Sequence, residues 1–160
     1  MTVTVSLEPM TAERYVSWFG DLVRHFAQDK IDSGSWPEAE AFERSAKQNA
    51  DLLPQGVGTA GHHLFVGTVG GEEMGYLWLY VDASTMPLEA FIYDIEIIEG
   101  QRGRGLGRGL LDAGERWCAE HDVVMLRLHV FGFNTAAIHL YETSGFETTD
   151  LNMAKQIVPA

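Results

Sequence analysis

A glycine-rich, basic turn is the segment of this sequence best suited to chemistry. Residues 102–108 read Arg-Gly-Arg-Gly-Leu-Gly-Arg and hold three of the chain's 11 Lys and Arg residues, although the net charge is −12. They follow a β-rich run, 89–98, and precede a run with helical spacing. The first N–H groups of a helix have no intrahelical partner, so glycines there let an anion approach the backbone while arginines add favourable charge. This segment predicts a pyrophosphate-binding turn.

Two other phosphate motifs do not fit these residues. A Walker motif requires Lys and then Ser or Thr after its last glycine, whereas Gly107 is followed by Arg108 and Gly109, which offer no hydroxyl for magnesium. A dinucleotide-binding fold would need a further glycine and a chain of repeating βαβ units before the turn. The elements that precede residue 102 do not repeat in that way.

Two blocks of residues carry a resemblance to a known family. The pattern Arg102-x-x-Gly105-x-Gly107, followed by two leucines, resembles the acetyl-CoA signature of the GNAT acyltransferase superfamily. Residues 134–146, Asn-Thr-Ala-Ala-Ile-His-Leu-Tyr-Glu-Thr-Ser-Gly-Phe, are similar to its later motif, in which an asparagine opens a helix and a Leu-Tyr pair precedes Gly-Phe. The resemblance is specific over residues 89–146 and only topological before them.

The resemblance implies an acetyl-CoA-dependent N-acetyltransferase that moves an acetyl group to a primary amine of a small molecule, peptide or protein by direct attack in a ternary complex. In the superfamily the strand before the turn splays from the next strand, and the pantetheine arm pairs with main chain in the gap. The residues implied to bind the co-substrate are Ile97, Ile98, Arg102, Gly103, Arg104, Gly105, Leu106, Gly107, Arg108 and Asn134.

Direct attack on a thioester requires a neutral amine, a stabilised tetrahedral intermediate and a proton for the departing thiolate. Tyr141 is the candidate proton donor, because a phenol that titrates near pH 10 can meet the thiolate if its helix aims it at the sulfur. Packing is the alternative role, since Ala137 and Leu140 share the helical face of Tyr141.

The general base has more than one candidate. Asp94 and Glu96 alternate with apolar residues, so both carboxylates point to one face of their strand unless a bulge intervenes. His129, on the next expected strand, competes with Glu96 because its intrinsic pKa suits the task. With Tyr141, Glu96 and His129 form the expected catalytic set, and a structural or solvated role for either base stays open. The remaining histidines lack metal-ligand spacing, so no metal is expected.

The elements that must position these residues follow from hydrophobic periodicity and turn signals. We expect a single domain over residues 1–160 with a mixed α/β fold, in which helices flank a twisted, mostly antiparallel mixed sheet. The expected strands are 3–7, 63–69, 74–81, 89–98 and 123–131, the expected helices are 11–28, 37–53, 106–118 and 134–144, and an extended tail covers 146–158.

The composition of the chain indicates its expected compartment and its expected partners. A single cysteine, Cys118, and the lack of about 18 consecutive apolar residues favour a reduced, cytoplasmic protein without membrane contact. A net charge of −12 disfavours nucleic acid and favours cationic ligands. A homodimer is possible because the superfamily often pairs. The alternatives are a non-catalytic acyl-CoA-binding sensor, which would need no acid such as Tyr141, and a structural interaction module.

Overall fold

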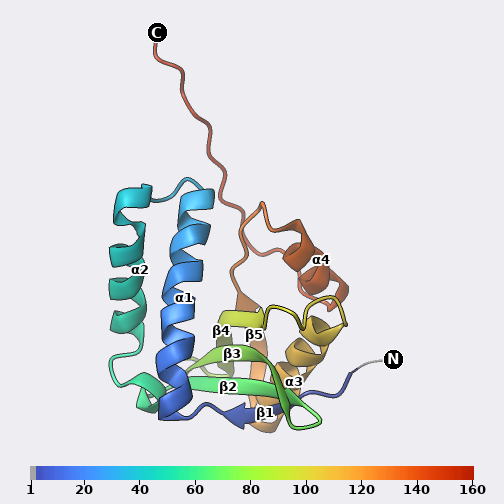
Figure 1. Ribbon diagram of the computed structural model, residues 1–160. Coiled ribbons are helices and arrows are strands. Elements are labelled where there is room, and N and C mark those ends of the chain that lie inside the picture. The colour runs from blue at the N-terminus through green and yellow to red at the C-terminus, as the bar shows by residue number, and fades with distance from the viewer. Residues whose placement is uncertain (1–2) are drawn as a thin grey trace.

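A five-stranded mixed sheet organises the computed structural model, which describes residues 3–160 (Figure 1). The strands lie in sequence order: β1 (Ser6–Pro9), β2 (His62–Val69), β3 (Glu72–Asp82), β4 (Leu88–Ile97) and β5 (Val123–Leu128). The first four pair antiparallel, whereas β4 and β5 run parallel. The predicted mixed fold with a mostly antiparallel sheet is confirmed.

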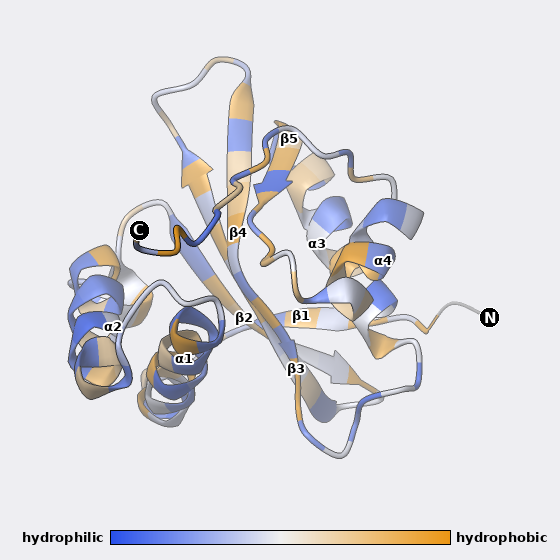
Figure 2. Cartoon of the chain, turned by 90° about the horizontal axis from the view of Figure 1, so that it is seen from above, coloured by the Kyte–Doolittle hydropathy of each residue, from blue (hydrophilic) through white to orange (hydrophobic). Residues whose placement is uncertain are grey.

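Helices cover both faces of this sheet. Viewed from above, α1 (Ala12–Asp32) and α2 (Glu38–Leu52) lie on one side, and α3 (Leu106–Glu120) and α4 (Thr135–Thr143) lie on the other (Figure 2). A short 3-10 turn, Gly56–Gly58, follows α2. Because side chains alternate along a strand, β3 supplies both layers of the core. Trp78 packs on the α1 side, while Leu77 and Leu79 pack on the α3 side.

The second and third expected strands form an antiparallel hairpin of β2 and β3. Gly70 and Gly71 connect β2 to β3 with φ values of +60° and +87°. Two consecutive positive φ values suit a tight two-residue turn whose twist matches that of the flanking strands, and glycine adopts them without steric cost.

Three predicted boundaries were wrong. The first strand spans Ser6–Pro9 rather than residues 3–7. Helix α1 continues to Asp32 instead of ending at residue 28, and the turn that follows it contains Gly34 with a φ of +73°. The chain leaves the β conformation at Leu128 instead of residue 131, because the ladder between β4 and β5 ends at the Ile92–Leu128 pair. A strand without a neighbour has no ladder to hold it extended.

Two irregularities of β4 create the site. Trp78 on β3 pairs with Asp94, whereas the next residue, Leu79, pairs with Ile92, so Tyr93 is an extra residue in a β-bulge. Past Ile92, β4 continues to Ile97 after its pairing with β5 has ended. The carboxyl half of β4 therefore borders the gap where the two parallel strands diverge, as the family resemblance implied.

Candidate active site

A cavity of about 670 Å³ lies beside this half of β4, at the N-terminal end of α3. Its walls come from α1, β4, the glycine-rich turn, the start of α3 and the first turns of α4. The lining residues are His25, Gln28, Asp29, Asp94, Ile95, Glu96, Ile97, Arg102, Gly103, Gly105, Leu106, Gly107, Asn134, Ala136, Ala137 and Leu140. The two sequence blocks that carry the family resemblance thus meet at one cavity.

The glycine-rich turn exposes the N-terminus of α3. Gly103 and Gly105 have φ values of +81° and +71°, and Gly105 occupies the N-cap position without a side-chain cap. The N–H of Gly109 donates to the carbonyl of Gly105 at 3.2 Å, which begins the helical ladder. The N–H groups before Gly109 have no intrahelical acceptor, and the positive end of the helix dipole adds to their attraction for an anion.

Arg102 is the arginine of the turn that lines the cavity. Its Nε donates to the carbonyl of Ile97 at 3.3 Å, and its Nη2 lies 3.7 Å from Oε1 of Glu96. These contacts hold the guanidinium between the end of β4 and the turn. Arg102 therefore adds positive charge next to the free amides of α3.

The other two arginines of the turn donate hydrogen bonds to residues of the protein itself. Arg104 donates to Oε1 of Gln101 at 3.3 Å. Arg108 donates to the carbonyl of Thr143 at 3.2 Å and to its Oγ1 at 2.7 Å, and it also reaches Ser144. Arg108 thus ties α3 to the C-terminal end of α4, which fixes the wall of the cavity. Co-substrate contacts of Arg104 and Arg108 stay predictions.

Three further predicted co-substrate residues differ in their placement. Asn134 lines the cavity and caps α4, because its Oδ1 accepts from the N–H of Ala137 at 3.2 Å. Ile97 also lines the cavity. The N–H of Ile98 donates to the carbonyl of Met74 at 3.0 Å, and its side chain packs against the α1-side core. Main-chain pairing with a ligand is therefore more accessible at Ile97 than at Ile98.

Acidic side chains gather at the α1 side of the cavity. Asp94 and Glu96 share one face of β4, as the alternation predicted, because the bulge at Tyr93 precedes both. Oε1 of Glu96 lies 3.0 Å from Nδ1 of His25. Burial raises the pKa of Asp29, and the nearby carboxylates of Asp32 and Glu96 add to that effect. The cavity thus has one acidic end and one end rich in amides and positive charge.

Of these acids, Asp94 has the pKa that departs most from its ordinary value. Its Oδ2 and the Nε1 of Trp18 are shielded from solvent, and neither atom has a hydrogen-bond partner of normal geometry within residues 3–160. Burial and the charge of Glu96 raise the pKa of Asp94, the indole N–H of Trp18 partly offsets both, and the resulting pKa is about 7. A buried carboxyl that titrates near neutrality in a cavity is a candidate general base.

The predicted acid and the second predicted base lie at different places. Tyr141 is partly buried against the α3-side core, its ring lies 5.8 Å from that of Phe146, and it is not among the residues that line the cavity, although its neighbour Leu140 is. Burial, and then the charge of Asp94, raise the pKa of Tyr141, so the phenol keeps its proton. His129 is exposed, its ring lies 5.0 Å from that of Phe131, and it is not among the residues that line the cavity.

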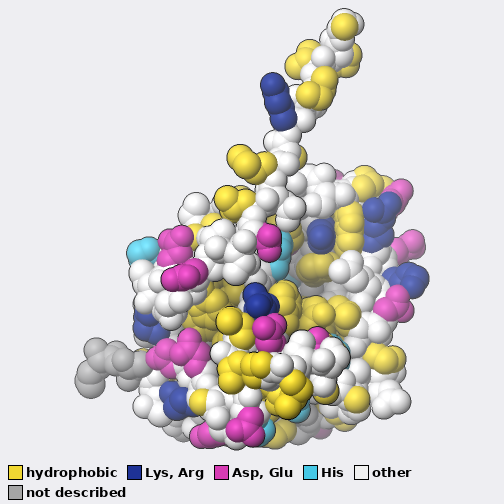
Figure 3. Space-filling model, turned by 180° about the vertical axis from the view of Figure 1, so that it is seen from behind, with side chains coloured by type: hydrophobic (Ala, Val, Ile, Leu, Met, Phe, Trp, Pro, Cys, Tyr) yellow, Lys and Arg dark blue, Asp and Glu magenta, His cyan; other side chains and the backbone are white. Residues whose placement is uncertain are grey.

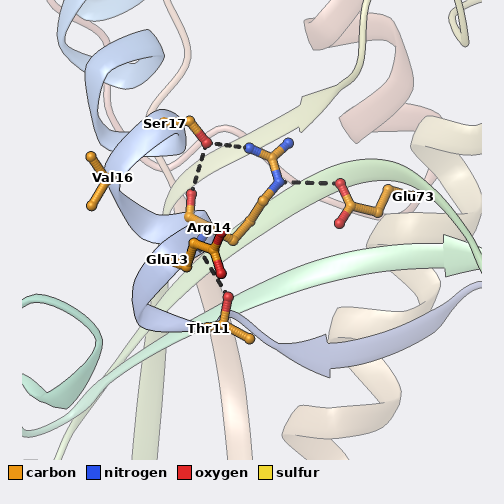
Figure 4. Close-up of a pocket in the computed structure, with 6 residues that line it drawn as sticks. All are labelled: Thr11, Glu13, Arg14, Val16, Ser17 and Glu73. Carbon is orange, nitrogen blue, oxygen red and sulfur yellow. Dashed lines mark hydrogen bonds and ion pairs between the residues drawn. The ribbon is translucent and has the colours of Figure 1, made fainter.

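A second, smaller hollow of about 520 Å³ lies at the start of α1 (Figure 4). Its central residue is Arg14, whose Nε donates to Oε2 of Glu73 at 3.2 Å and whose Nη1 donates to Oγ of Ser17 at 2.6 Å. Because these polar groups already satisfy one another, the hollow is a weaker candidate than the cavity at β4. None of the predicted catalytic or co-substrate residues lines it.

Sequence reasoning missed the contribution of α1 to the site. His25, Gln28 and Asp29 line the cavity, but the sequence shows them only as polar positions on an amphipathic helix. Which turn of α1 crosses the end of β4 depends on tertiary packing. Within residues 3–160 there is no group of three or more His, Cys, Asp or Glu side chains arranged to hold a metal, and no helix both long and apolar enough to span a bilayer.

Known proteins share both the sequence pattern and the fold. A family model described as the acetyltransferase (GNAT) family matches residues 22–146. The uncharacterized N-acetyltransferase YdgE of Bacillus subtilis is 37% identical over 153 residues, which are 95% of this chain and 98% of that protein. The crystal structure of the putative acetyltransferase YycN, also from Bacillus subtilis, has a TM-score of 0.95 at 34% identity and covers 98% of this chain and 100% of its own.

A third relative matches only in part. The mycothiol acetyltransferase of Rhodococcus erythropolis is 34% identical over 125 residues, which are 77% of this chain but 40% of that enzyme. The chain therefore spans less than half the length of this relative. This chain is thus similar to part of a named acetyltransferase, and the match does not identify the acceptor of this chain.

Proposed function

This chain belongs to the GNAT acetyltransferase family, and on that premise we propose that it transfers the acetyl group of acetyl-CoA to a cationic primary amine. The family uses acetyl-CoA, and the relatives are named N-acetyltransferases, so the chain is an enzyme of this class rather than a non-catalytic sensor. One observation carries the finer proposal: a single cavity joins an anion-binding end to an acidic end.

The anion-binding end suits the pyrophosphate of acetyl-CoA. Free amides at the start of α3, the open backbone of Gly103 and Gly105, and the guanidinium of Arg102 converge there. The stretch of β4 past Ile92, which pairs with β3 but not with β5, leads from that end toward Asp94, and Ile97 offers main chain to an extended arm. This path would bring a thioester to the middle of the cavity.

The acidic end suits an ammonium group. Asp29, Asp94 and Glu96 approach from two elements, and the charge of Glu96 helps raise the pKa of both Asp29 and Asp94, so a cation there relieves repulsion. A net charge of −12 adds a long-range field of the same sign. The proposed acceptor is therefore a small molecule or peptide that carries a primary ammonium group.

Each catalytic role in the transfer has a proposed residue. Asp94 takes the proton from the bound ammonium, and the neutral nitrogen then attacks the thioester carbonyl to form the C–N bond. As the C–S bond breaks, Tyr141 donates its proton to the departing thiolate, the attacking nitrogen releases its second proton to solvent to leave a neutral amide, and solvent reprotonates the phenolate. Direct transfer between two bound substrates needs no acyl-enzyme. Glu96, paired with His25, attracts the ammonium and is the rival base.

Substitution of Gly105 tests the co-substrate end. A Cβ added at Gly105 meets no atom within 4 Å, whereas one at Gly107 would lie 3.2 Å from Cδ2 of Leu140 and disturb the contact between α3 and α4. Gly105→Asn keeps a residue that tolerates positive φ but fills space beside the free amides. We expect acetyl-CoA affinity to fall by about tenfold or more, a loss of about 1.4 kcal/mol that calorimetry resolves.

Gly34→Asn is the matched control for this measurement. Gly34 has a φ of +73°, an added Cβ also meets no atom within 4 Å, and the residue does not line the cavity. The control should bind acetyl-CoA like the parent. If Gly105→Asn also binds like the parent, the turn does not hold the pyrophosphate.

A further inference from the structure

Lys30 places its ammonium group among three aromatic rings. Its Nζ lies 5.4 Å from the ring centre of Phe26, 5.2 Å from that of Trp36 and 5.8 Å from that of Phe131. The electron-rich face of an aromatic ring attracts a cation within about 6 Å of the ring centre. Although the net charge is −12, no carboxylate within residues 3–160 forms an ion pair with Lys30. The three rings are therefore the partners of this ammonium group.

Two of the rings are held in place at the end of α1. Phe26 lies one turn before Lys30, and its ring meets the ring of Trp36 edge to face, with 5.7 Å between their centres. The N–H of Trp36 donates to the carbonyl of Lys30 at 3.2 Å. Both rings thus belong to α1 and to the loop that follows it, and their mutual contact does not depend on the ammonium group.

The third ring comes from the loop between β5 and α4. The ring of Phe131 stacks on that of Phe133 at 5.4 Å, and the carbonyl of Phe131 accepts from the N–H of Asn134 at 3.0 Å. Asn134 in turn caps α4. Within residues 3–160 the ring of Phe131 has ring partners in its own loop only, so the ammonium group of Lys30 links this loop to α1.

Lys30 therefore joins two walls of the cavity. Asp29, the residue before Lys30, lines the cavity from α1, whereas Asn134, three residues after Phe131, lines it from the start of α4. Asp94 lines the same cavity from β4. The separation of the α1 and α4 walls sets the space that an acceptor can occupy beside that carboxyl group.

We propose that Lys30 is a positioning residue for the acceptor: its ammonium group holds the loop between β5 and α4 against the end of α1 and so fixes the width of the cavity beside Asp94. Lys30, Phe26, Trp36 and Phe131 form the Lys30 clamp. The role in acceptor binding rests on the proposed function, whereas the contacts of the clamp do not require a substrate. A misplacement of about 1 Å can lower a rate by about 10²-fold, so a loosened wall would slow turnover of the acceptor.

Lys30→Met tests the clamp in steady-state kinetics, with primary alkylamines such as cadaverine as acceptors. Methionine keeps most of the side-chain length and the apolar contacts with the rings but removes the charge. We expect kcat/KM for the amine to fall by about tenfold or more. Acetyl-CoA affinity should stay that of the parent, because the contacts of Arg102 and Arg108 around the glycine-rich turn are unchanged.

Three further variants identify the charge as the cause. Lys30→Arg keeps a cation that stacks on aromatic faces, so it should recover most of the lost kcat/KM. Phe131→Leu removes the ring on the α4 side, and combining it with Lys30→Met should cost no more than the larger single loss, because both changes break one contact. Lys47→Met is the matched control and should keep the parent's kcat/KM, because Lys47 pairs with Asp51 on α2 at 2.6 Å and does not line the cavity.

Lysine-selective NMR detects the clamp without any acceptor. The chain has three lysines, of which Lys47 is exposed on α2 and Lys155 lies in the extended C-terminal segment that projects from the body of the protein (Figure 3). Ring currents should shift the ε-methylene protons of Lys30 upfield of those of the other two lysines. Phe131→Leu should reduce that shift, and Lys30→Met, unlike Lys47→Met, should move the amide signal of Asn134.

The kinetics and the NMR signals fail for different reasons. A parent that acetylates no primary amine would contradict the proposed function, and the positioning role would fall with it. Lys30 signals that coincide with those of Lys47 and Lys155 would overturn the clamp while the proposed function stands. The proposal is also wrong if Lys30→Met matches Lys47→Met in kcat/KM, or if Lys30→Arg loses as much as Lys30→Met.

Discussion

Asp94→Asn is expected to lower kcat/KM for the amine acceptor by about 10²- to 10⁴-fold, because it removes the carboxyl that takes the proton from the ammonium while keeping its size. Asp94 lines the cavity, its buried Oδ2 has no hydrogen-bond partner of normal geometry among residues 3–160, and its pKa is raised to about 7, chiefly by burial. Initial rates at saturating acetyl-CoA give the comparison. A loss smaller than threefold would remove Asp94 from the mechanism.

The pH profile identifies the base more directly than the rate alone. Alkylamines such as the lysine side chain titrate near pH 10, whereas peptide α-amino groups titrate near pH 8, so the profile is measured with an alkylamine acceptor. Around neutrality that acceptor is an ammonium ion, and an inflection there belongs to the enzyme. The parent's kcat/KM should rise with pH and level off above about 7, where Asp94 is ionised. Asp94→Asn should lose this inflection, whereas Glu96→Gln should retain it and mainly raise KM.

Stability provides the control for Asp94→Asn. The pKa of Asp94 is raised on folding, so its contribution to stability is present below the unfolded value of about 3.9 and is lost as pH rises through about 7. An asparagine does not titrate, and the variant should therefore be at least as stable as the parent at pH 8. A loss of rate without a loss of melting temperature then reports on chemistry.

Tyr141→Phe is expected to lower kcat by about 10²-fold or more with little change in acetyl-CoA affinity, because it removes only the proton donor to the thiolate. Burial and the charge of Asp94 raise the pKa of Tyr141, which keeps the phenol protonated over the working range. Single-turnover measurements separate this loss from slow product release.

Tyr15→Phe serves as the comparison for that substitution. Tyr15 lies on α1 and packs against the α1-side core, and burial also raises its pKa, but the charge of Asp94 does not contribute to that shift as it does for Tyr141. It should leave turnover unchanged. Equal turnover in Tyr141→Phe and the parent would assign Tyr141 to packing against the α3-side core, the alternative that its helical face already suggested.

Much of the fold could be predicted from local patterns. The hairpin at Gly70 and Gly71, the helix that follows the glycine-rich turn and the cap at Asn134 each depend on residues within a few positions of one another. Such features can be predicted because the conformation of a glycine turn and the hydrogen bond of a helix cap depend on residues that are close in sequence. The two sequence blocks around residues 102–108 and 134–146 were visible for the same reason.

The acceptor side of the site could not be predicted in this way. Its acidic group combines Asp29 of α1 with two residues of β4, and the crossing of α1 over the sheet depends on how Trp18 packs against Trp78. The altered pKa of Asp94 arises from burial by residues distant in sequence. Likewise, the extended tail over residues 146–158 was predicted, but its path away from the sheet was not.

The measurement that tests the central claim most directly is the mass of the product formed from acetyl-CoA and a panel of acceptors, with coenzyme A release followed in parallel. Polyamines, aminoglycosides, amino acids and peptides with free amines should be compared with neutral and anionic molecules of similar size. We expect cationic amines to gain one acetyl group, with an acceptor KM that rises as salt shortens the Debye length from about 10 Å at 0.1 M to about 3 Å at 1 M. Acetylation confined to neutral or anionic acceptors, a KM that does not change with salt, or no acetylated product at all would contradict the proposal.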